Sequence, residues 1–485
     1  MIDLYKPVLF SALERYGSFL FYLISAAILA RLLSPLEFGI CSIALALTNV
    51  LTGYFQEFGG GNYLIQKSVL TERNIRTAFT VTLVSFLCVA LLLYVLSGVA
   101  ARFFAQDGLQ IGIAVCAINL ALAPISVTIS ALLRREMAFA VLARCNLVAN
   151  FVSSFSAVGF AMGGWSFLAP ILGMLAGTIV YTALLLVCRP QHRILRPSLE
   201  GYREVFRFGA YSSSVVILNV FYQWFPQLMI GRILDFAAVG LYSRAVNITQ
   251  LFDRAILQIL NPVIMPAISA RARAGGDLKS AYLVAMELLS VLQWPSLLFI
   301  ALMSDTLILI WLGPTWIDVV PLVRALCIAS LSMFAAPLTY PVLVAIGRVQ
   351  DTLTSSLISL PPSLLITIAA SFWGVQAVAN VALIVFPFQA AVAIWFVARR
   401  LAISPAELMR AVSKSIVVTI FCMASALIGL FIITYSGAGP VVALLSAGFF
   451  ASAGWLLALI ITNHGLVVRM RTLTHVALAG RLSFH

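Results

Sequence analysis

The chain contains fourteen stretches of about twenty or more predominantly apolar residues, separated by short segments with charged residues, Pro or Gly. A stretch of this length crosses the hydrocarbon core of a bilayer as an α-helix, which satisfies its own backbone hydrogen bonds in lipid. The sequence lacks the alternation of apolar and polar residues that is typical of barrel strands. We therefore predict an all-α integral membrane protein with about 14 transmembrane helices, at residues 9–32, 37–56, 75–98, 109–133, 140–162, 165–188, 206–231, 238–264, 281–303, 319–346, 352–372, 376–398, 412–434 and 440–462.

The composition agrees with this prediction. Of the 485 residues, 62% are hydrophobic and 10% are charged, whereas a soluble domain has about 45–50% and about 25%. A water-soluble globule is excluded, and the spans leave no room for a sizeable domain outside the membrane. The seven cysteines occur singly, without the spacing of a metal site or a redox motif, and are expected to be buried apolar side chains.

Basic residues are distributed unevenly between the two sides of the membrane that the spans define. Of the 30 Lys and Arg residues, 24 lie on the side of the amino terminus and four on the opposite side, while Arg254 and Arg324 lie within predicted spans. This asymmetry predicts that the basic side faces the cytoplasm, so both termini are cytoplasmic. The net charge of +13 is then explained by topology, and no nucleic-acid partner is expected. The first span lacks a small-residue cleavage pattern and is expected to remain uncleaved.

Two segments of the chain match each other at a constant offset. Residues 31–42 align with residues 232–243 at an offset of 201, and each segment links one span to the next. In both copies a Ser or Asp can cap the following helix, and Gly39 or Gly240 follows five residues later, where helices could approach closely. A second match pairs residues 123–125 with 336–338, each followed by a basic turn, at Arg135 and Arg348; its offset of 213 differs from the first by a small insertion.

The two matches together predict a repeat unit of six spans. A unit with an even number of spans returns to its starting side, so the two halves are parallel repeats about an axis along the membrane normal. We expect an N-terminal six-helix lobe at 1–198, a C-terminal six-helix lobe at 199–404, and two extra helices with a cytoplasmic tail at 405–485. Two such lobes around a central cavity are a transporter architecture, in which the lobes rock to open one side and then the other.

Polar residues recur at helical spacing in the two spans that begin the second half. In the span at 238–264 they step by 3, 4, 4 and 3, which places them on one helical face. We expect both stripes to line the cavity and to contact substrate. Amides can also join helices through interhelical hydrogen bonds, and both interpretations stay open for the asparagines. The residues are Asn247, Gln250, Arg254, Gln258 and Asn261 in this span, and Asn219, Gln223 and Gln227 in the span before it.

Ionisable groups at membrane depth need a partner or water, because each costs about 2.5 to 3.5 kcal/mol on insertion scales. Arg254 cannot be neutralised, so it must line water or form an ion pair, with Asp253 or Glu287 as candidate partners. Arg324 is a further cavity candidate, although its long side chain could instead reach the membrane interface. Glu14, Asp253 and Glu287 are candidates either for coupling to a proton or cation, or for structural ion pairs with arginines.

An arginine among amides suits a substrate with an anionic phosphate and many hydroxyl groups. A guanidinium binds phosphate bidentately, and Asn and Gln both donate to and accept from sugar hydroxyls. The sequence contains no catalytic constellation, and the glycine run 59–61 is expected to be a flexible loop entry. We therefore expect no enzymatic activity, no metal and no cofactor. The histidines lie in or near predicted cytoplasmic segments without metal-like spacing, at His192, His464, His475 and His485.

Four segments resemble one known family of membrane proteins. They are 33–39 (LSPLEFG), 55–66 (FQEFGGGNYLIQ), 133–139 (LRREMAF) and 206–209 (FRFG). The chain is similar here to the polysaccharide transporter (Wzx-type oligosaccharide flippase) family of the multidrug/oligosaccharidyl-lipid/polysaccharide exporter superfamily. The similarity covers most of the chain and is densest in the first 210 residues. The family pattern has an acidic residue and Gly-x-Gly after the second span, where this chain has Glu57 and three glycines.

The resemblance implies a multi-pass protein of the bacterial inner membrane with two six-helix lobes and two extra helices. It implies that the chain moves undecaprenyl-pyrophosphate-linked sugar repeat units from the cytoplasmic to the external leaflet, next to glycosyltransferases and a polysaccharide polymerase. A cation-coupled multidrug exporter or a lipid II-type flippase of the same superfamily is the alternative. A drug exporter would have a carboxylate-centred cavity, whereas a pyrophosphate-lipid flippase would have a basic one, and Arg254 favours the flippase.

Overall fold

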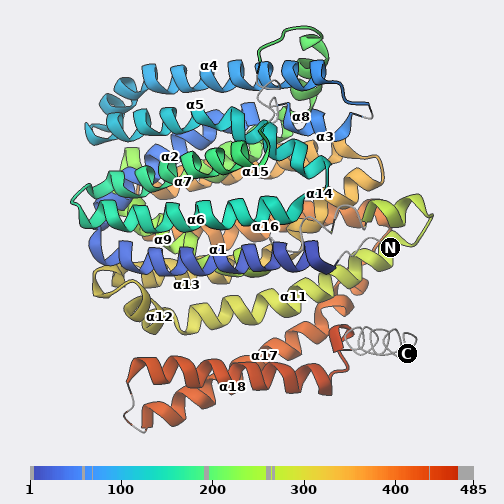
Figure 1. Ribbon diagram of the computed structural model, residues 1–485. Coiled ribbons are helices and arrows are strands. Elements are labelled where there is room, and N and C mark those ends of the chain that lie inside the picture. The colour runs from blue at the N-terminus through green and yellow to red at the C-terminus, as the bar shows by residue number, and fades with distance from the viewer. Residues whose placement is uncertain are drawn as a thin grey trace, which may run out of the picture. The chain divides into compact units, whose positions relative to one another are not determined.

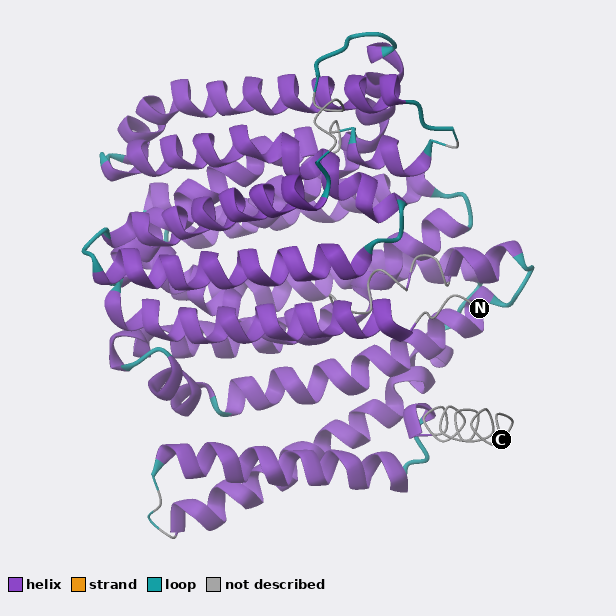
Figure 2. Cartoon of the chain, viewed as in Figure 1, coloured by secondary structure: helices purple, strands orange, loops and turns teal. Residues whose placement is uncertain are grey.

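The computed structural model describes residues 5–56, 60–67, 69–190, 196–257, 264, 268–435, 437 and 439–467. Figure 2 shows that these residues form helices joined by short loops, and none of them is in a strand. The all-α prediction is therefore confirmed. The physical reason is that a helix pairs its backbone N–H and C=O groups within one segment, which hydrocarbon requires.

The chain divides into two compact units, and each is described here by itself. The first unit comprises Met1–Arg244 together with Ile368–Val375. Neighbouring helices α4 and α5 pack against each other, as do α6 and α7 (Figure 1), while α1 packs on α6 and α2 packs on α8 and α5. The unit contains α1 (Tyr5–Leu32), α2 (Pro35–Gln56), α3 (Gly61–Gln66), α4 (Glu72–Phe104), α5 (Gly108–Arg135), α6 (Phe139–Met162), α7 (Ala169–Cys188), α8 (Tyr202–Ile233) and the start of α9 (Phe236–Thr249).

The second unit comprises Ala245–Thr367 and Gln376–His485. Its last two helices, α17 and α18, form an antiparallel pair (Figure 1), and α11 packs on α17 and α13. After the remainder of α9, the helices are a π-helical segment (Asp253–Leu257), α11 (Leu278–Leu302), α12 (Ser304–Trp311), α13 (Val320–Ser330), α14 (Ala336–Ala345), α15 (Val349–Ser371), α16 (Val375–Leu401), α17 (Pro405–Tyr435) and α18 (Pro440–Ile461).

Twelve helical stretches of the described residues are long and apolar enough to cross a membrane. They correspond to twelve of the fourteen predicted spans. The other two predicted spans, 206–231 and 238–264, correspond to the amide-bearing α8 and to α9, which ends at Thr249. The predicted span 319–346 is interrupted, because a 3-10 turn at Leu331–Ala335 separates α13 from α14. Pro337 lies at the start of α14, where the missing N–H of proline costs no helical hydrogen bond.

Helices α2 and α9 begin next to each other and touch through residues that are equivalent in the repeat. A Cβ atom built on Gly39 would overlap the carbonyl oxygen of Phe236. One built on Gly240 would overlap the carbonyl oxygen of Pro35. Because Pro35 and Phe236 are separated by the same offset as the two glycines, each copy of the repeat makes the same contact with the other copy.

A hydrogen bond continues this reciprocal contact one turn further along the two helices. The Ser42 hydroxyl donates to Ser243 Oγ at 3.0 Å, and the two serines are again 201 residues apart. The Ser243 hydroxyl in turn donates to the carbonyl oxygen of Gly240 at 3.0 Å. Equivalent residues that face each other are the mark of a two-fold relation. The parallel repeat predicted from the sequence is thus visible as a direct contact.

We predict that neither helix start tolerates a side chain at its glycine. Gly39→Ala and Gly240→Ala should each lower the free energy of unfolding by about 1–3 kcal/mol, since a Cβ atom meets backbone that no rotamer change can move. Thermal unfolding in detergent, followed by size-exclusion fluorescence, measures the effect. Gly159→Ala in α6 is the matched control, because a Cβ atom there meets nothing within 4 Å. Equal stability of all three variants would contradict the close approach.

Candidate functional site

The polar stripe of the second unit begins on α9 and continues past its end. Asn247 lies in the last turns of α9, and Arg254 lies in the π-helical segment Asp253–Leu257. The Arg254 Nη2 group donates to Asn247 Oδ1 at 2.9 Å, so these two side chains project from the same side of the helix. Single π-helical turns within α-helices are often found at functional sites, because they re-aim side chains and loosen the backbone ladder.

Arg254 is partly buried, and its guanidinium donates to an amide. Asp253, the neighbouring carboxylate, has no ion-pair partner among the described residues. Glu287, the other candidate partner, faces His464 and the backbone N–H of Gly465. The amide oxygen of Asn247 accepts a hydrogen bond from the guanidinium without adding a negative charge beside it.

The other residues of this stripe are described only in part. Gln250 is partly buried, and its carbonyl oxygen accepts the backbone N–H of Arg254 at 3.0 Å. Gln258 and Asn261 lie outside the described residues. The end of α9 is held on α13, where the Cys327 thiol donates to Thr249 Oγ1 at 3.8 Å. This contact fixes the helix one turn before the stripe reaches Arg254.

The stripe of the first unit lies on α8. Gln223 is exposed and Gln227 is buried, one helical turn further on, while the side chain of Asn219 lies outside the described part of the structure. The Gln227 side-chain oxygen has no hydrogen-bond partner among the described residues. A buried acceptor without a donor costs about 1–3 kcal/mol. Gln227 is therefore suited to accept a hydrogen bond from a hydroxyl group or a water molecule.

Arg324 is held by the short helix α12. Its Nε group donates to Ser304 Oγ at 3.1 Å, and its Nη2 group forms an ion pair with Asp305. The Arg324 side chain is 47% exposed. Its charge is thus compensated by a neighbouring carboxylate.

The polar residues of the first two spans mostly satisfy one another or their own helices. Ser18 of α1 accepts a hydrogen bond from Asn150 Nδ2 of α6 at 2.9 Å. The Asn49 amide of α2 donates to the carbonyl oxygen of Leu45 at 2.8 Å. Glu14 is partly buried in α1, next to Arg15 in the chain. These bonds favour a structural role for Ser18 and Asn49.

The glycine run after α2 is a packing feature where the structure describes it. Gly60 is buried, and a Cβ atom built on it would lie 2.5 Å from the Cβ atom of Ala78 in α4. Its backbone N–H donates to Thr82 Oγ1 at 2.8 Å. Residues 57–59 lie outside the described residues.

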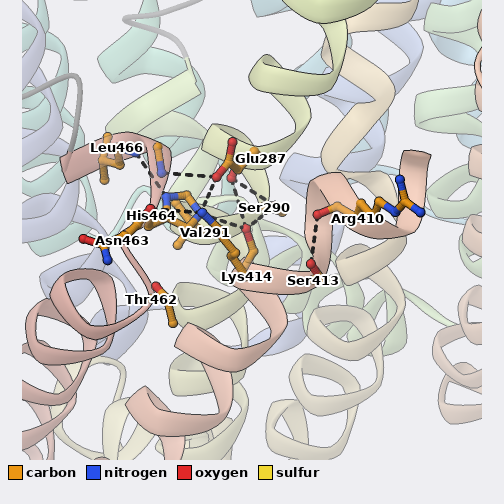
Figure 3. A network of polar contacts seen from close by, with 12 residues as sticks. Glu287, Ser290, Val291, Arg410, Ser413, Lys414, Thr462, Asn463, His464 and Leu466 are labelled. Atoms are coloured by element: carbon orange, nitrogen blue, oxygen red, sulfur yellow. Dashed lines mark hydrogen bonds and ion pairs between the residues drawn. The ribbon is translucent and has the colours of Figure 1, made fainter. Parts of the chain in front are cut away.

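Sequence reasoning missed a fully buried histidine of the second unit. His464 follows the end of α18 and is 0% exposed, and it lies against Glu287 of α11 (Figure 3). Nothing in the sequence around His464 indicates burial, since the residue comes after an apolar span where a cytoplasmic segment is expected. The one sequence feature that could have indicated a buried partner is the carboxylate of Glu287 within a distant apolar stretch.

The described residues therefore provide a partly buried guanidinium beside an amide, and do not provide a metal centre. Among them, no group of three or more His, Cys, Asp or Glu side chains could hold a metal ion. A guanidinium with a neighbouring amide can bind an anionic group and adjacent hydroxyl groups. The arrangement is suited to recognition and contains no pairing of a nucleophile with a base at the stripe.

Known proteins resemble this chain in sequence. The chain is 24% identical over 305 residues to the teichuronic acid biosynthesis protein TuaB of Bacillus subtilis (strain 168), which covers 60% of this chain and 61% of TuaB. It is 22% identical over 317 residues to the lipopolysaccharide biosynthesis protein WzxC of Escherichia coli (strain K12), covering 64% of this chain and 63% of WzxC. Each match spans less than two thirds of the relative's length.

The fold has a solved counterpart. The structure is similar to the lipid II flippase MurJ in an inward closed conformation, with a TM-score of 0.75 and 11% sequence identity, over 95% of this chain and 100% of that chain. At this identity the likeness shows the fold alone, which is the two-lobed fold of a multi-pass membrane protein. The family model for polysaccharide biosynthesis proteins matches residues 28–321. This segment is more than half of the chain, and the chain therefore belongs to the polysaccharide biosynthesis protein family.

Proposed function

We propose that this protein is a flippase that moves polyprenyl-pyrophosphate-linked oligosaccharide repeat units across the bacterial inner membrane. The observation that carries the proposal is the partly buried guanidinium of Arg254, which donates to the Asn247 amide, within a membrane protein of the polysaccharide biosynthesis family. The translocated unit serves the synthesis of exopolysaccharide, capsule or O-antigen. The printed names of TuaB and WzxC, which refer to teichuronic acid and lipopolysaccharide, support this class of product.

The side chains of the two polar stripes suit the two chemical parts of such a substrate, the pyrophosphate and the sugars. The guanidinium of Arg254 can bind the pyrophosphate, since charged hydrogen bonds to phosphate are among the strongest that a side chain makes. Amide groups such as those of Asn247, Gln250, Gln223 and Gln227 can bind sugar hydroxyls, because each amide both donates and accepts. Gln227, which is buried without a donor among the described residues, is the best placed of these amides to accept from a hydroxyl.

Alternating access is the proposed mechanism by which the substrate crosses the membrane. We propose that the lobes 1–198 and 199–404 rock about the axis of the repeat, and that the reciprocal contact of Ser42 with Ser243 belongs to the closed external side. Both serines follow a linker on the side opposite the basic loops. An outward-open state requires the starts of α2 and α9 to separate, and the glycines allow backbone contact without interlocked side chains when they meet again.

The cellular setting follows from the same proposal. Both termini and the basic loops face the cytoplasm, and lipid-linked oligosaccharide is the substrate. Glycosyltransferases that assemble the repeat unit and a polymerase that consumes it are the expected functional partners. The chain itself performs transport and no covalent chemistry. Glu14 and Asp253, with no ion-pair partner among the described residues, are candidates for coupling to a proton or cation.

Arg254→Ala should reduce flipping about tenfold to a hundredfold at normal protein level, because it removes a charged hydrogen bond worth about 1.5–3 kcal/mol. The measurement is surface polysaccharide and accumulated lipid-linked precursor in a deletion strain that carries the variant. Arg324→Ala is the matched control, since Arg324 is already paired with Asp305. Full transport by Arg254→Ala would remove the main support for the proposal. Export of organic cations with no effect on polysaccharide would favour a multidrug exporter.

The contact between Ser42 and Ser243 predicts that a disulfide at these positions locks the protein in one conformation. Under oxidation, the double variant Ser42→Cys/Ser243→Cys should form a disulfide, because the two hydroxyl oxygens are 3.0 Å apart. Flipping should stop and should resume after reduction. Each single variant serves as the control for the native cysteines. Unimpaired flipping by the fully cross-linked protein would contradict the role of this contact in alternating access.

Topology can be tested independently of transport. A reporter protein that is active only in the cytoplasm should be active when fused after residue 485, and equally when fused before residue 1, because the basic residues concentrate on that side. A reporter that matures only outside the inner membrane is the complementary control. An external signal at either end would refute the proposed orientation.

A further inference from the structure

A buried polar cluster joins the last two helices to α11. Glu287 comes from α11, Ser415 comes from α17, and His464 follows the end of α18 (Figure 3). Apolar contacts of Val291, Val418, Ala458 and Leu459 lie beside this cluster. The same junction contains a hydrogen bond from Trp455 Nε1 to the carbonyl oxygen of Val291 at 3.0 Å.

The contacts of His464 identify its protonation state. The backbone N–H of Leu466 donates to Nδ1 at 3.2 Å, so Nδ1 carries no proton. Nε2 lies 3.3 Å from Ser415 Oγ and 3.6 Å from Glu287 Oε1, which are both acceptors. The ring is therefore neutral, with its single proton on Nε2.

Glu287 forms hydrogen bonds both to the segment after α18 and to α17. Its Oε1 atom accepts the backbone N–H of Gly465 at 3.2 Å. Its carbonyl oxygen accepts the Ser415 hydroxyl at 3.1 Å, and the Ser290 hydroxyl lies 2.8 Å from Ser415 Oγ. The carboxylate thus holds the start of the segment after α18, and the serines hold α17 on α11.

An added proton is incompatible with this arrangement. On His464 the proton must occupy Nδ1, where it would point at the N–H of Leu466, so two donors would face each other. On Glu287 the proton removes the negative charge that faces Gly465 and His464. On His464 the proton thus breaks the bond from the Leu466 N–H that shapes the turn 464–466, and on Glu287 it weakens the charge-assisted bond that fastens Gly465 to α11.

The charged groups around His464 come from two of the three elements. Glu287 faces it from α11, and Lys414 lies on α17, where its Nζ atom donates to the carbonyl oxygen of Asn463 at 3.0 Å. Burial, together with the positive charge of Lys414, holds the pKa of His464 below its ordinary value, against the opposing effect of Glu287. Since the pKa is depressed in the folded state, the stabilising contribution is complete above the ordinary histidine pKa of about 6.5 and is lost as the pH falls below it.

We propose that Glu287 and His464 form a proton-binding site that controls the attachment of the α17–α18 pair to α11. With no added proton the helix pair is fastened, and uptake of a proton releases the segment after α18. The site lies at the basic ends of these helices, so the proton comes from the compartment that the proposed topology makes cytoplasmic. Only the consequence for transport rests on the proposed flippase function; proton binding and release of the segment do not.

The first test is a direct titration of the histidines. The protein in lipid nanodiscs carries ¹³C-labelled histidine, and the His464 signal is assigned by its loss in His464→Gln. We expect the His464 midpoint below 6.5, shifted upward in Lys414→Gln and downward in Glu287→Gln. Lys414→Gln removes the bond to the Asn463 carbonyl oxygen but keeps Glu287, Ser415 and His464. An ordinary midpoint that neither variant moves would overturn the proposal.

The second test measures release of the segment without substrate. Deuterium uptake in the peptide that contains Trp455 and His464, corrected for the intrinsic effect of pH on exchange, should be at least severalfold faster at pH 5.5 than at pH 7.5. His464→Gln should abolish this difference, and a peptide from α4 should show none. Uptake that is independent of pH in the native protein would overturn the proposal. Full flipping by Arg254→Ala with the pH effect intact would count against the proposed function and leave this site supported, so the two proposals fail separately.

Discussion

Hydrocarbon offers no hydrogen bonds to the peptide backbone, and every peptide group within the membrane must therefore find its partner inside the protein. Regular α-helices meet this requirement locally, which explains why the described residues form helices and no strands. Where the backbone departs from a regular helix, its N–H and C=O groups need other hydrogen-bond partners within the protein. Examples in the second unit are the π-helical segment after α9, the interrupted α13–α14 stretch, and the turn that buries His464 after α18. The proposed substrate stripe and the proposed proton site lie at the first and the third of these.

The charged groups of the second unit have different surroundings. The Arg324 guanidinium forms an ion pair with Asp305, and the Glu287 carboxylate faces His464 and the backbone N–H of Gly465. The Arg254 guanidinium donates to the Asn247 amide. A partly buried guanidinium beside an amide is suited to bind an anionic group.

Much of the fold could be predicted from the sequence, because residue type and spacing indicate both the spans and the repeat. Helices α1, α2 and α18 begin or end within a few residues of the predicted boundaries, and the offset of 201 reappears in the bond between Ser42 and Ser243. The π-helical segment was not predictable, since its residues fit regular helical spacing. His464 was missed because its burial depends on α11 and α17, which are distant in the chain. The pairing of Arg254 with Asn247 was compatible with the predicted face but could not be distinguished from pairing with Glu287.

The reciprocal contact of the two helix starts has a consequence for assembly. Two separate six-helix halves that met through Gly39, Ser42 and their counterparts would associate to an extent that depends on their concentration in the membrane. In one polypeptide the second half is always present at a high local concentration, so the contact forms at any level of expression. The contact between the helix starts also needs no extensive interlocking surface. A few close backbone contacts and one hydrogen bond between two hydroxyl groups are enough to form it. In the proposed alternating-access cycle, covalent linkage would allow this contact to break and re-form without the two halves separating.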